Sequence, residues 1–217
     1  MRRAFLRSGF GVGILIGLGL LNPMASADDN AAAASPPQPY RIFIEPAALA
    51  RPASVPLENS RSTVFTPMRE QDGRFTPWDK DQFERLRIGP GPFLQRAIQI
   101  AGQDLNRVRA QRLRDPLNAD GGEYVLITSE QPIVAALMLS PRLRRWLEPA
   151  LGEDQWLVAP DQYTLYVFSA ASDILQTLGP TIAVQFENAV WPASLEVFEW
   201  QPDSTQPRAV ATLGAAD

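Results

Sequence analysis

The chain contains no cysteine and no histidine among its 217 residues, and Lys80 is its single lysine. Without cysteine there are no disulfides, no thiolate nucleophile and no lipid-anchored N-terminal cysteine. Without histidine there is no Ser-His-Asp triad, no HExxH zinc motif and no imidazole base. These absences exclude the commonest hydrolase and metalloenzyme sites, and we accordingly predict no catalytic residue, no metal and no cofactor.

The charge of the chain argues against one class of partner. Its 20 basic and 24 acidic residues give a formal charge of −4. Loss of the first 27 residues would remove three arginines and no acid, which takes the charge from −4 to −7. A mildly acidic chain does not attract polyanions through its bulk charge, so we expect no nucleic-acid partner.

The first 27 residues have the three parts of a signal peptide. Three arginines precede a short apolar stretch over residues 10–21, and Ala25-Ser26-Ala27 matches a cleavage site. The stretch is shorter than the roughly 20 residues of a spanning helix. We therefore predict cleavage after Ala27, export to the periplasm or the exterior, and no stable membrane span afterwards. The opening RRAFLR also resembles the twin-arginine consensus, which leaves the Sec and twin-arginine routes both open.

Three further parts follow the signal. Residues 28–39 are rich in alanine and proline and predict a disordered tether. Residues 40–76 predict an extended, proline-rich segment around the core. Within it, Tyr40–Pro46 alternates large apolar with polar residues and predicts a strand, whereas prolines recur from Pro46 to Thr76 without a hydrophobic period and indicate loops. Residues 77–213 mix apolar strand-like runs with amphipathic stretches, and predict a single α+β domain with a largely antiparallel sheet packed by helices.

Local patterns within this domain predict its helices and strands. We expect a helix from Thr76, capped by that threonine, and a long helix over residues 90–115 with an apolar stripe at four-three spacing. Two further helices are expected from Pro141 to Gly152 and from Ser172-Asp173 to about Asn188. Strands are expected at EYVLITS (123–129), SLEVFEWQP (194–202) and RAVATL (208–213).

Two apolar runs, 156–158 and 165–168, are predicted to be adjacent antiparallel strands at the centre of the core. They stand too close together for a parallel crossover, which needs a dozen or more residues. The joint between them, Pro160-Asp161-Gln162, has the residues of a turn. An aspartate at a strand end beside an aromatic ring can also line a cleft, so Asp161 and Tyr163 are candidate partner contacts.

The remaining charged groups allow a functional and a structural interpretation. Asp79, Asp81 and Glu84 offer the two carboxylates that a glycosidase-type hydrolase requires, although the first turn of any helix favours acids. Lys80 with a nearby serine is a weaker alternative, because no motif surrounds it.

Two groups of arginines either bind a phosphate or an acidic partner, or form solvated helix faces. One group ends the predicted long helix and one belongs to the next, where Arg142 and Arg145 are candidate partner contacts. The groups are Arg107, Arg109, Arg112 and Arg114, then Arg142, Arg144 and Arg145. Trp146, Trp156, Trp191 and Trp200 are predicted in the core, whereas an exposed pair of them would indicate a peptide- or sugar-binding surface.

Several phrases occur in the order found in a bacterial family of unknown function. An apolar helix precedes EYVLIT, and WLVAPDQYTLYVFSA and LGPTIAVQFENAVWPASLEVFEWQPD follow it. Over about residues 90–212 the chain resembles this YtpQ-like family. The resemblance implies the order of elements given above, and it implies no established activity, cofactor or catalytic residue.

From these observations we expect an exported, non-catalytic binding module with a protein or peptide partner in the bacterial envelope. A hydrolase that uses only carboxylates, and a cofactor-carrying twin-arginine substrate, are the alternatives. Two carboxylates facing each other in a cleft would favour the hydrolase. Acids scattered on a convex surface, beside an exposed apolar patch, would favour the binding module.

Overall fold

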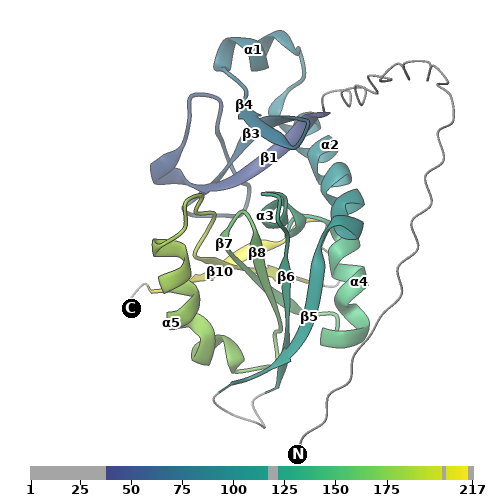
Figure 1. The fold of residues 1–217 in the computed structure, drawn as a ribbon, viewed down its shortest axis with the longest axis vertical. Coiled ribbons are helices and arrows are strands. Elements are labelled where there is room, and N and C mark those ends of the chain that lie inside the picture. The colour runs from purple at the N-terminus through teal and green to yellow at the C-terminus, as the bar shows by residue number, and fades with distance from the viewer. Residues whose placement is uncertain (1–37, 117–121, 202–203, 215–217) are drawn as a thin grey trace, which may run out of the picture. The chain divides into compact units, whose positions relative to one another are not determined.

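The computed structural model describes residues 38–116, 122–201 and 204–214. The predicted signal peptide with Ala27, and residues 28–37 of the predicted tether, lie outside this range. From Gln38 onward the described residues belong to one unit that mixes helices with antiparallel strands. The α+β class is therefore confirmed, with the strands divided between a four-stranded and a six-stranded sheet (Figure 1).

The four-stranded sheet occupies the segment that we expected to be loop-rich. Its central strand β3 pairs antiparallel with each of the other three strands. Asp72 and Gly73 connect β3 to β4, and both have positive φ, as a tight two-residue hairpin turn requires. The strand expected at Tyr40–Pro46 is confirmed within β1, whereas the prediction of loops from Pro46 to Thr76 was wrong. Prolines fit at strand ends, and Pro67 of β3 falls between the residues that pair with β2 and those that pair with β4. The strands are β1 (Gln38–Pro46), β2 (Val55–Pro56), β3 (Thr63–Gln71) and β4 (Arg74–Pro77).

The six-stranded sheet has the order β10-β9-β7-β8-β6-β5, with every neighbouring pair antiparallel. The predicted central pair is confirmed as β7 and β8. The turn differs from the predicted Pro160-Asp161-Gln162, because Pro160 and Asp161 belong to β7. Asp161 pairs with Thr164, so Gln162 and Tyr163 form the turn. The strands are β5 (Arg109–Arg114), β6 (Glu123–Thr128), β7 (Gln155–Asp161), β8 (Thr164–Ser169), β9 (Glu196–Trp200) and β10 (Arg208–Thr212).

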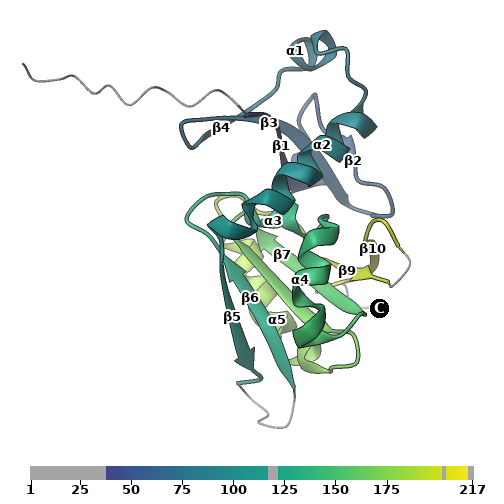
Figure 2. The same ribbon diagram turned by 90° about the vertical axis from the view of Figure 1, so that its right-hand side faces the viewer.

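Helices cover both faces of the six-stranded sheet (Figure 2). Leu157 and Val167 face a large apolar cluster that also contains residues of α2, α3, α4 and the smaller sheet. Val158 and Phe168 face a second cluster with α5. Burial on both faces explains why these two strands are continuous apolar runs. The helices are α1 (Lys80–Arg85), α2 (Pro90–Gln103), α3 (Val134–Leu137), α4 (Pro141–Leu151) and α5 (Ile174–Glu187), with 3₁₀ turns η1 (Ala47–Leu49) and η2 (Asp104–Arg107).

Two of the four helix predictions need correction, and the helices expected from Pro141 to Gly152 and from Ser172-Asp173 to about Asn188 are confirmed as α4 and α5. The helix expected from Thr76 begins at Lys80, because Thr76 and Pro77 belong to β4. The long helix expected over 90–115 ends at Gln103, and its arginine-rich half becomes strand β5. The capping prediction for α4 is confirmed: Ser140 Oγ accepts a hydrogen bond from Arg142 N, and Gly152 ends the helix at φ 87°.

Candidate functional site

The strongest candidate site is an open pocket where the end of α2 and η2 meet the start of α4. Arg142, Arg145 and Trp146 of α4 line one side of it. Both arginines are exposed, and Trp146 exposes 46% of its surface, so the prediction that this tryptophan is in the core was wrong. Gln103, Leu105 and Asn106 line the other side.

Gly102 of α2 determines how closely the start of α4, with the arginines of the pocket, can approach α2. A Cβ at Gly102 would lie 2.8 Å from Ser140 Oγ and 3.0 Å from Arg142 Cδ. Only glycine therefore lets the start of α4 approach α2 this closely without a shift. The aliphatic stem of Arg142 packs on the backbone of α2, which holds its guanidinium end toward the pocket.

The charges of the pocket are not neutralised within the described chain. Neither Arg142 nor Arg145 forms an ion pair there, whereas other arginines have partners. Arg144, between them, turns elsewhere and donates through Nε to the backbone oxygen of Glu153 at 3.3 Å. Two guanidinium groups beside an exposed indole are suited to a carboxylate that has apolar atoms next to it.

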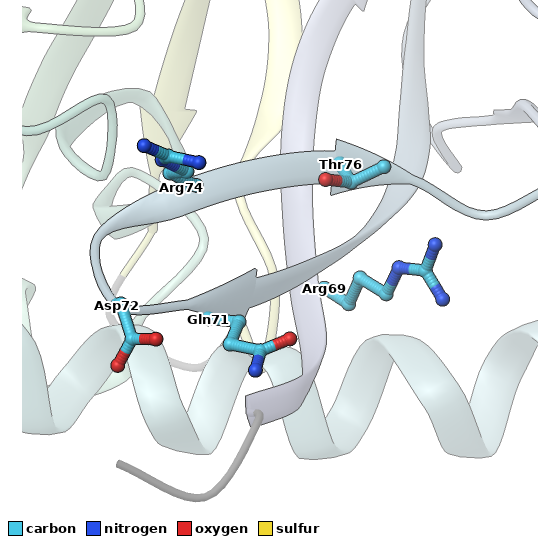
Figure 3. A pocket seen from close by; sticks show the side chains of 5 residues that line it. All are labelled: Arg69, Gln71, Asp72, Arg74 and Thr76. Atoms are coloured by element: carbon cyan, nitrogen blue, oxygen red, sulfur yellow. The ribbon is translucent and has the colours of Figure 1, made fainter. Parts of the chain in front are cut away.

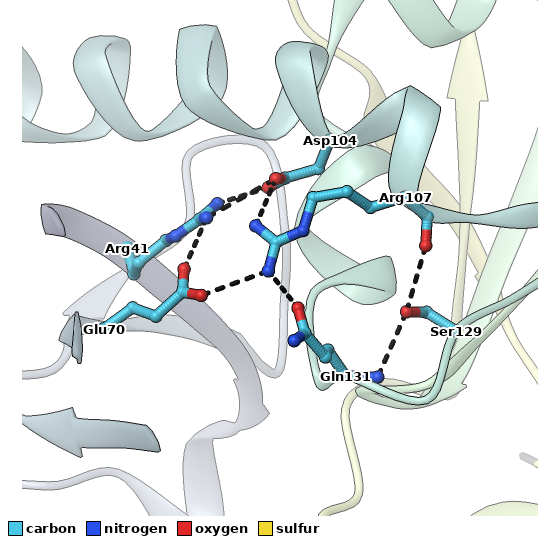
Figure 4. A network of polar contacts seen from close by, with 6 residues as sticks. All are labelled: Arg41, Glu70, Asp104, Arg107, Ser129 and Gln131. Atoms are coloured by element: carbon cyan, nitrogen blue, oxygen red, sulfur yellow. Dashed lines mark hydrogen bonds and ion pairs between the residues drawn. The ribbon is translucent and has the colours of Figure 1, made fainter. Parts of the chain in front are cut away.

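A buried ion network lies nearby and has a structural explanation (Figure 4). Arg41 pairs with Glu70 at 2.5 Å and with Asp104, and Arg107 pairs with the same two acids at 3.1 and 2.8 Å. Burial lowers the pKa of Arg107, but its bonds to Glu70 and Asp104 outweigh this, so the net direction is upward. The network joins β1 and β3 to η2, and Gln131 accepts a further bond from Arg107.

A second open pocket, beside this network, lies at the start of β5. It is lined by Arg107 of η2 and Arg109 of β5, and by Thr128 at the end of β6 with the three residues that follow it, 129–131. Arg109 and Glu130 approach to 3.6 Å, but both side chains are at least 80% exposed, so this pair is worth little. The pocket is thus a polar, mostly basic end of the sheet rather than an enclosed site.

A third pocket lies on the hairpin of β3 and β4 (Figure 3). Its two arginines do not converge: Arg74 and Arg69 point in different directions from the hairpin. Arg69 lies over the ring of Trp78, 5.4 Å from its centre, in a cation–π contact. Its lining residues are Arg69, Gln71, Asp72, Arg74 and Thr76. We assign no ligand to this pocket.

Asp161 and Tyr163, the other candidate contacts, are engaged within the fold. Asp161 Oδ1 accepts a bond from Tyr163 N at 2.7 Å, and Oδ2 accepts one from Gln185 Nε2 at 2.7 Å. The Tyr163 ring stacks on Trp191 at 5.9 Å and 8°. Burial raises the pKa of Tyr163, and the charge of Asp161 adds to this. Trp191 is 39% exposed, a second correction to the predicted core, whereas Trp200 is fully buried as expected.

The carboxylates proposed for hydrolysis do not form an enclosed pair. Asp81 and Glu84 lie one turn apart on the exposed side of α1, in an open depression with Arg85 and Arg87. Asp79 and Lys80 are exposed at the start of the same helix. Across the described residues, no group of three or more Asp, Glu, His or Cys side chains is placed to hold a metal ion.

Three comparisons with known proteins found no match. No family model matches the chain, and neither a curated protein nor a solved structure does. The resemblance to the YtpQ-like family therefore stays a prediction. None of the helices in the described part of the chain has the length and apolar composition that a membrane crossing requires.

The sequence indicated part of the candidate site. Arg142 and Arg145 were identified from their clustering, and their place at the start of α4 followed from Ser140-Pro141. Trp146 was missed because a tryptophan is buried more often than not, and its position on α4 next to both arginines was the available signal. Its spacing did not decide the question, because it lies three residues after the buried Leu143 and residues three apart can share a helix face.

Proposed function

We propose that this protein is an exported, non-catalytic binding module of the bacterial envelope that recognises an acidic segment of a partner protein. The observation that carries the proposal is the pocket of Arg142 and Arg145, two arginines without an acidic partner in the described chain, beside the exposed Trp146. A protein with a formal charge of −4 repels acidic partners on average. At the pocket, the local positive charge of the two arginines attracts an acidic partner despite this average repulsion, and the indole beside them offers an apolar contact.

Other features of the sequence and structure fit this proposal. The N-terminal pattern ending at Ala27 supports export, by the Sec or the twin-arginine route, and supports a single α+β domain following a cleaved signal and a tether. The described acids lie on exposed surface or bond within the fold, as Asp161 does with Tyr163 and Gln185. The hydrolase and cofactor-carrier alternatives receive no specific support from the described residues, and they remain hypotheses.

A direct binding measurement tests the proposal. The probe is a fluorescently labelled seven-residue peptide, Glu-Thr-Glu-Val-Glu-Thr-Glu, blocked at both ends and titrated with the purified chain at low salt. We expect Arg142→Gln with Arg145→Gln to weaken binding at least about tenfold, since charge-assisted hydrogen bonds contribute most of the affinity. Trp146→Ala should weaken it further, and Trp146→Phe should keep most of it.

The matched control removes the same charge elsewhere. Arg85→Gln with Arg87→Gln also neutralises two arginines that line an open pocket, one at the end of α1 and one two residues beyond it. This variant should bind the peptide within about twofold of the unmodified chain, apart from a general charge effect that added salt removes. Equal losses in both double variants, or no binding by the unmodified chain, would show that Arg142 and Arg145 do not form the site.

A further inference from the structure

Strand β5 is an end strand of the six-stranded sheet with a free edge (Figure 2). Its only pairing partner in the described chain is β6, and five of its six residues are exposed. The opposite end strand differs, because Ala209 N of β10 donates to Asn59 O in the loop before β3 and that edge is partly covered. An uncovered edge presents a row of backbone donors and acceptors that an extended chain can join.

Two hydrogen bonds identify which residues of β5 point outward. Along an antiparallel pair, residues alternate between those that bond the neighbour and those that point away from it. Asp115 N donates to Gly122 O at 3.2 Å, one residue beyond the β5–β6 register. Counting back by twos, positions 109, 111 and 113 bond to β6.

The pairing of β6 with β8, on the other edge of β6, identifies the same outward-facing residues of β5. Ser129 N donates to Tyr163 O at 3.1 Å, one residue beyond the β6–β8 register. Positions 124, 126 and 128 of β6 therefore bond toward β5, and they are the register partners of 113, 111 and 109. The backbone N–H and C=O groups of Ala110, Arg112 and Arg114 thus face outward, and the described residues supply no partner for them.

The side chains along this edge determine what can join it. Arg109, Arg112 and Arg114 give a six-residue strand three positive charges. Arg112 and Arg114 share the single carboxylate of Glu123, at exposed positions where ion pairs exchange readily. A second copy of β5 would set arginine against arginine and be repelled. An acidic strand meets complementary charge.

This edge and the helix of the proposed pocket share one face of the sheet. Ala110 and Arg112 oppose Ile127 and Val125, which face the apolar cluster that includes α4. The outward-facing residues of β5 therefore have their side chains on the face of the sheet that α4 covers, the helix of Arg142 and Arg145. A chain added to β5 would direct every second side chain toward this basic face.

We infer that β5 binds its partner by strand addition, taking an extended acidic segment as a seventh strand of the sheet. This inference rests on the proposed function: the ligand is the same acidic segment, and the inference adds that the segment binds in an extended conformation through its backbone. The backbone of Ala110, Arg112 and Arg114 supplies the hydrogen bonds. The arginines of β5 and α4 select the charge.

The test uses the same heptapeptide in two N-methylated forms. One form is methylated at its two threonines and its valine, and the other at its last three glutamates. Methylation removes backbone donors along one edge of an extended peptide and leaves its charge unchanged. Strand addition predicts that one form loses at least about tenfold in affinity and that the other stays within about threefold. Equal behaviour of the two forms would overturn the inference.

A protein variant tests the same contact from the other side. Ala110→Pro removes one outward N–H at an edge position where proline is tolerated, and Ala110→Val adds bulk but keeps the N–H. We expect Ala110→Pro, with folding checked by circular dichroism, to weaken binding at least about fivefold, and Ala110→Val to stay within about twofold. If peptide binding depends on Arg142 and Arg145 but is the same in both Ala110 variants, strand addition is overturned and the proposed function is not. Failure of the unmodified peptide to bind would overturn the proposed function as well.

Discussion

At the scale of single residues, Gly102 is the position on which the geometry of the candidate site depends most. Gly102→Ala would bring a methyl group to 2.8 Å from Ser140 Oγ and 3.0 Å from Arg142 Cδ. We expect chemical denaturation to show a loss of about 1–3 kcal/mol, as overpacking does, together with weaker peptide binding because Arg142 moves.

Gly91 in the same helix provides the control, since a Cβ there meets nothing within 4 Å. Gly91→Ala should leave binding unchanged and raise the free energy of unfolding by up to about 1 kcal/mol, because alanine has less chain entropy to lose. If both variants behave alike, close packing of α2 on α4 is not what positions Arg142.

Asp161 tests whether the β7–β8 turn is structural. Asp161→Ala leaves Tyr163 N without its acceptor and removes one of the two acceptors of Gln185 Nε2, the other being Thr164 Oγ1. It should cost about 1–3 kcal/mol of stability. Asp161→Asn should cost less than about 1 kcal/mol. The side-chain oxygen of the asparagine still accepts from Tyr163 N. The side-chain amide of Gln185 can rotate by about 180°, so that its oxygen accepts from the NH₂ group of the asparagine. Both variants should bind the acidic peptide normally. A loss of binding in Asp161→Asn at unchanged stability would instead make the turn part of the site.

At the scale of elements, the buried ion network fastens the four-stranded sheet to η2. Arg41→Met leaves Glu70 and Asp104 with only Arg107 to compensate them, so we expect a loss of about 3 kcal/mol in the free energy of unfolding. The matched control is Arg51→Met in the same sheet region. Arg51 pairs with Glu45 through a guanidinium that is 43% exposed, and its loss should cost less than about 1 kcal/mol. Equal costs would mean that the network does not hold these elements together.

Three strands meet at Glu199, which gives their contact a pH dependence. Burial raises the pKa of Glu199, but hydrogen bonds from Trp156 and Arg208 outweigh it, and the pKa lies below its ordinary value of 4.5. A carboxylate with a depressed pKa stabilises the fold above its unfolded pKa, and this stabilisation is lost as the pH falls through the folded value. The stability difference between the unmodified chain and Glu199→Gln should thus be constant above about pH 6 and shrink below 4.5. In an Arg208→Gln background the difference should be smaller above about pH 6 and should change less as the pH falls. A difference that grows in acid would contradict this account.

At the scale of the whole molecule, much of the six-stranded sheet was predicted, whereas β1 was the one strand of the smaller sheet that was. Continuous apolar runs predicted β6, β7 and β8, and Ser140-Pro141 with Gly152 predicted both ends of α4, because these signals are local. Residues 109–114 favour a helix by composition, and only their pairing with β6 makes them a strand, which a local pattern does not contain.

The exposure of some side chains could likewise be predicted from the sequence, and that of others could not. Arg142 and Arg145 could be proposed from sequence because charged side chains stay near solvent wherever the fold places them. Trp146 and Trp191 could not, since a tryptophan is exposed or buried according to what packs over it. The Asp-Gly pair at residues 72–73 was a usable hairpin signal for β3 and β4.

The central claim, that this molecule recognises an acidic segment through Arg142 and Arg145, is tested most directly by exchanging charges. Arg142→Glu with Arg145→Glu is titrated with the acidic heptapeptide and with its counterpart Lys-Thr-Lys-Val-Lys-Thr-Lys. We predict that the variant loses at least about tenfold in affinity for the acidic peptide and gains affinity for the lysine peptide relative to the unmodified chain. An unchanged affinity of the variant for the acidic peptide would contradict the claim.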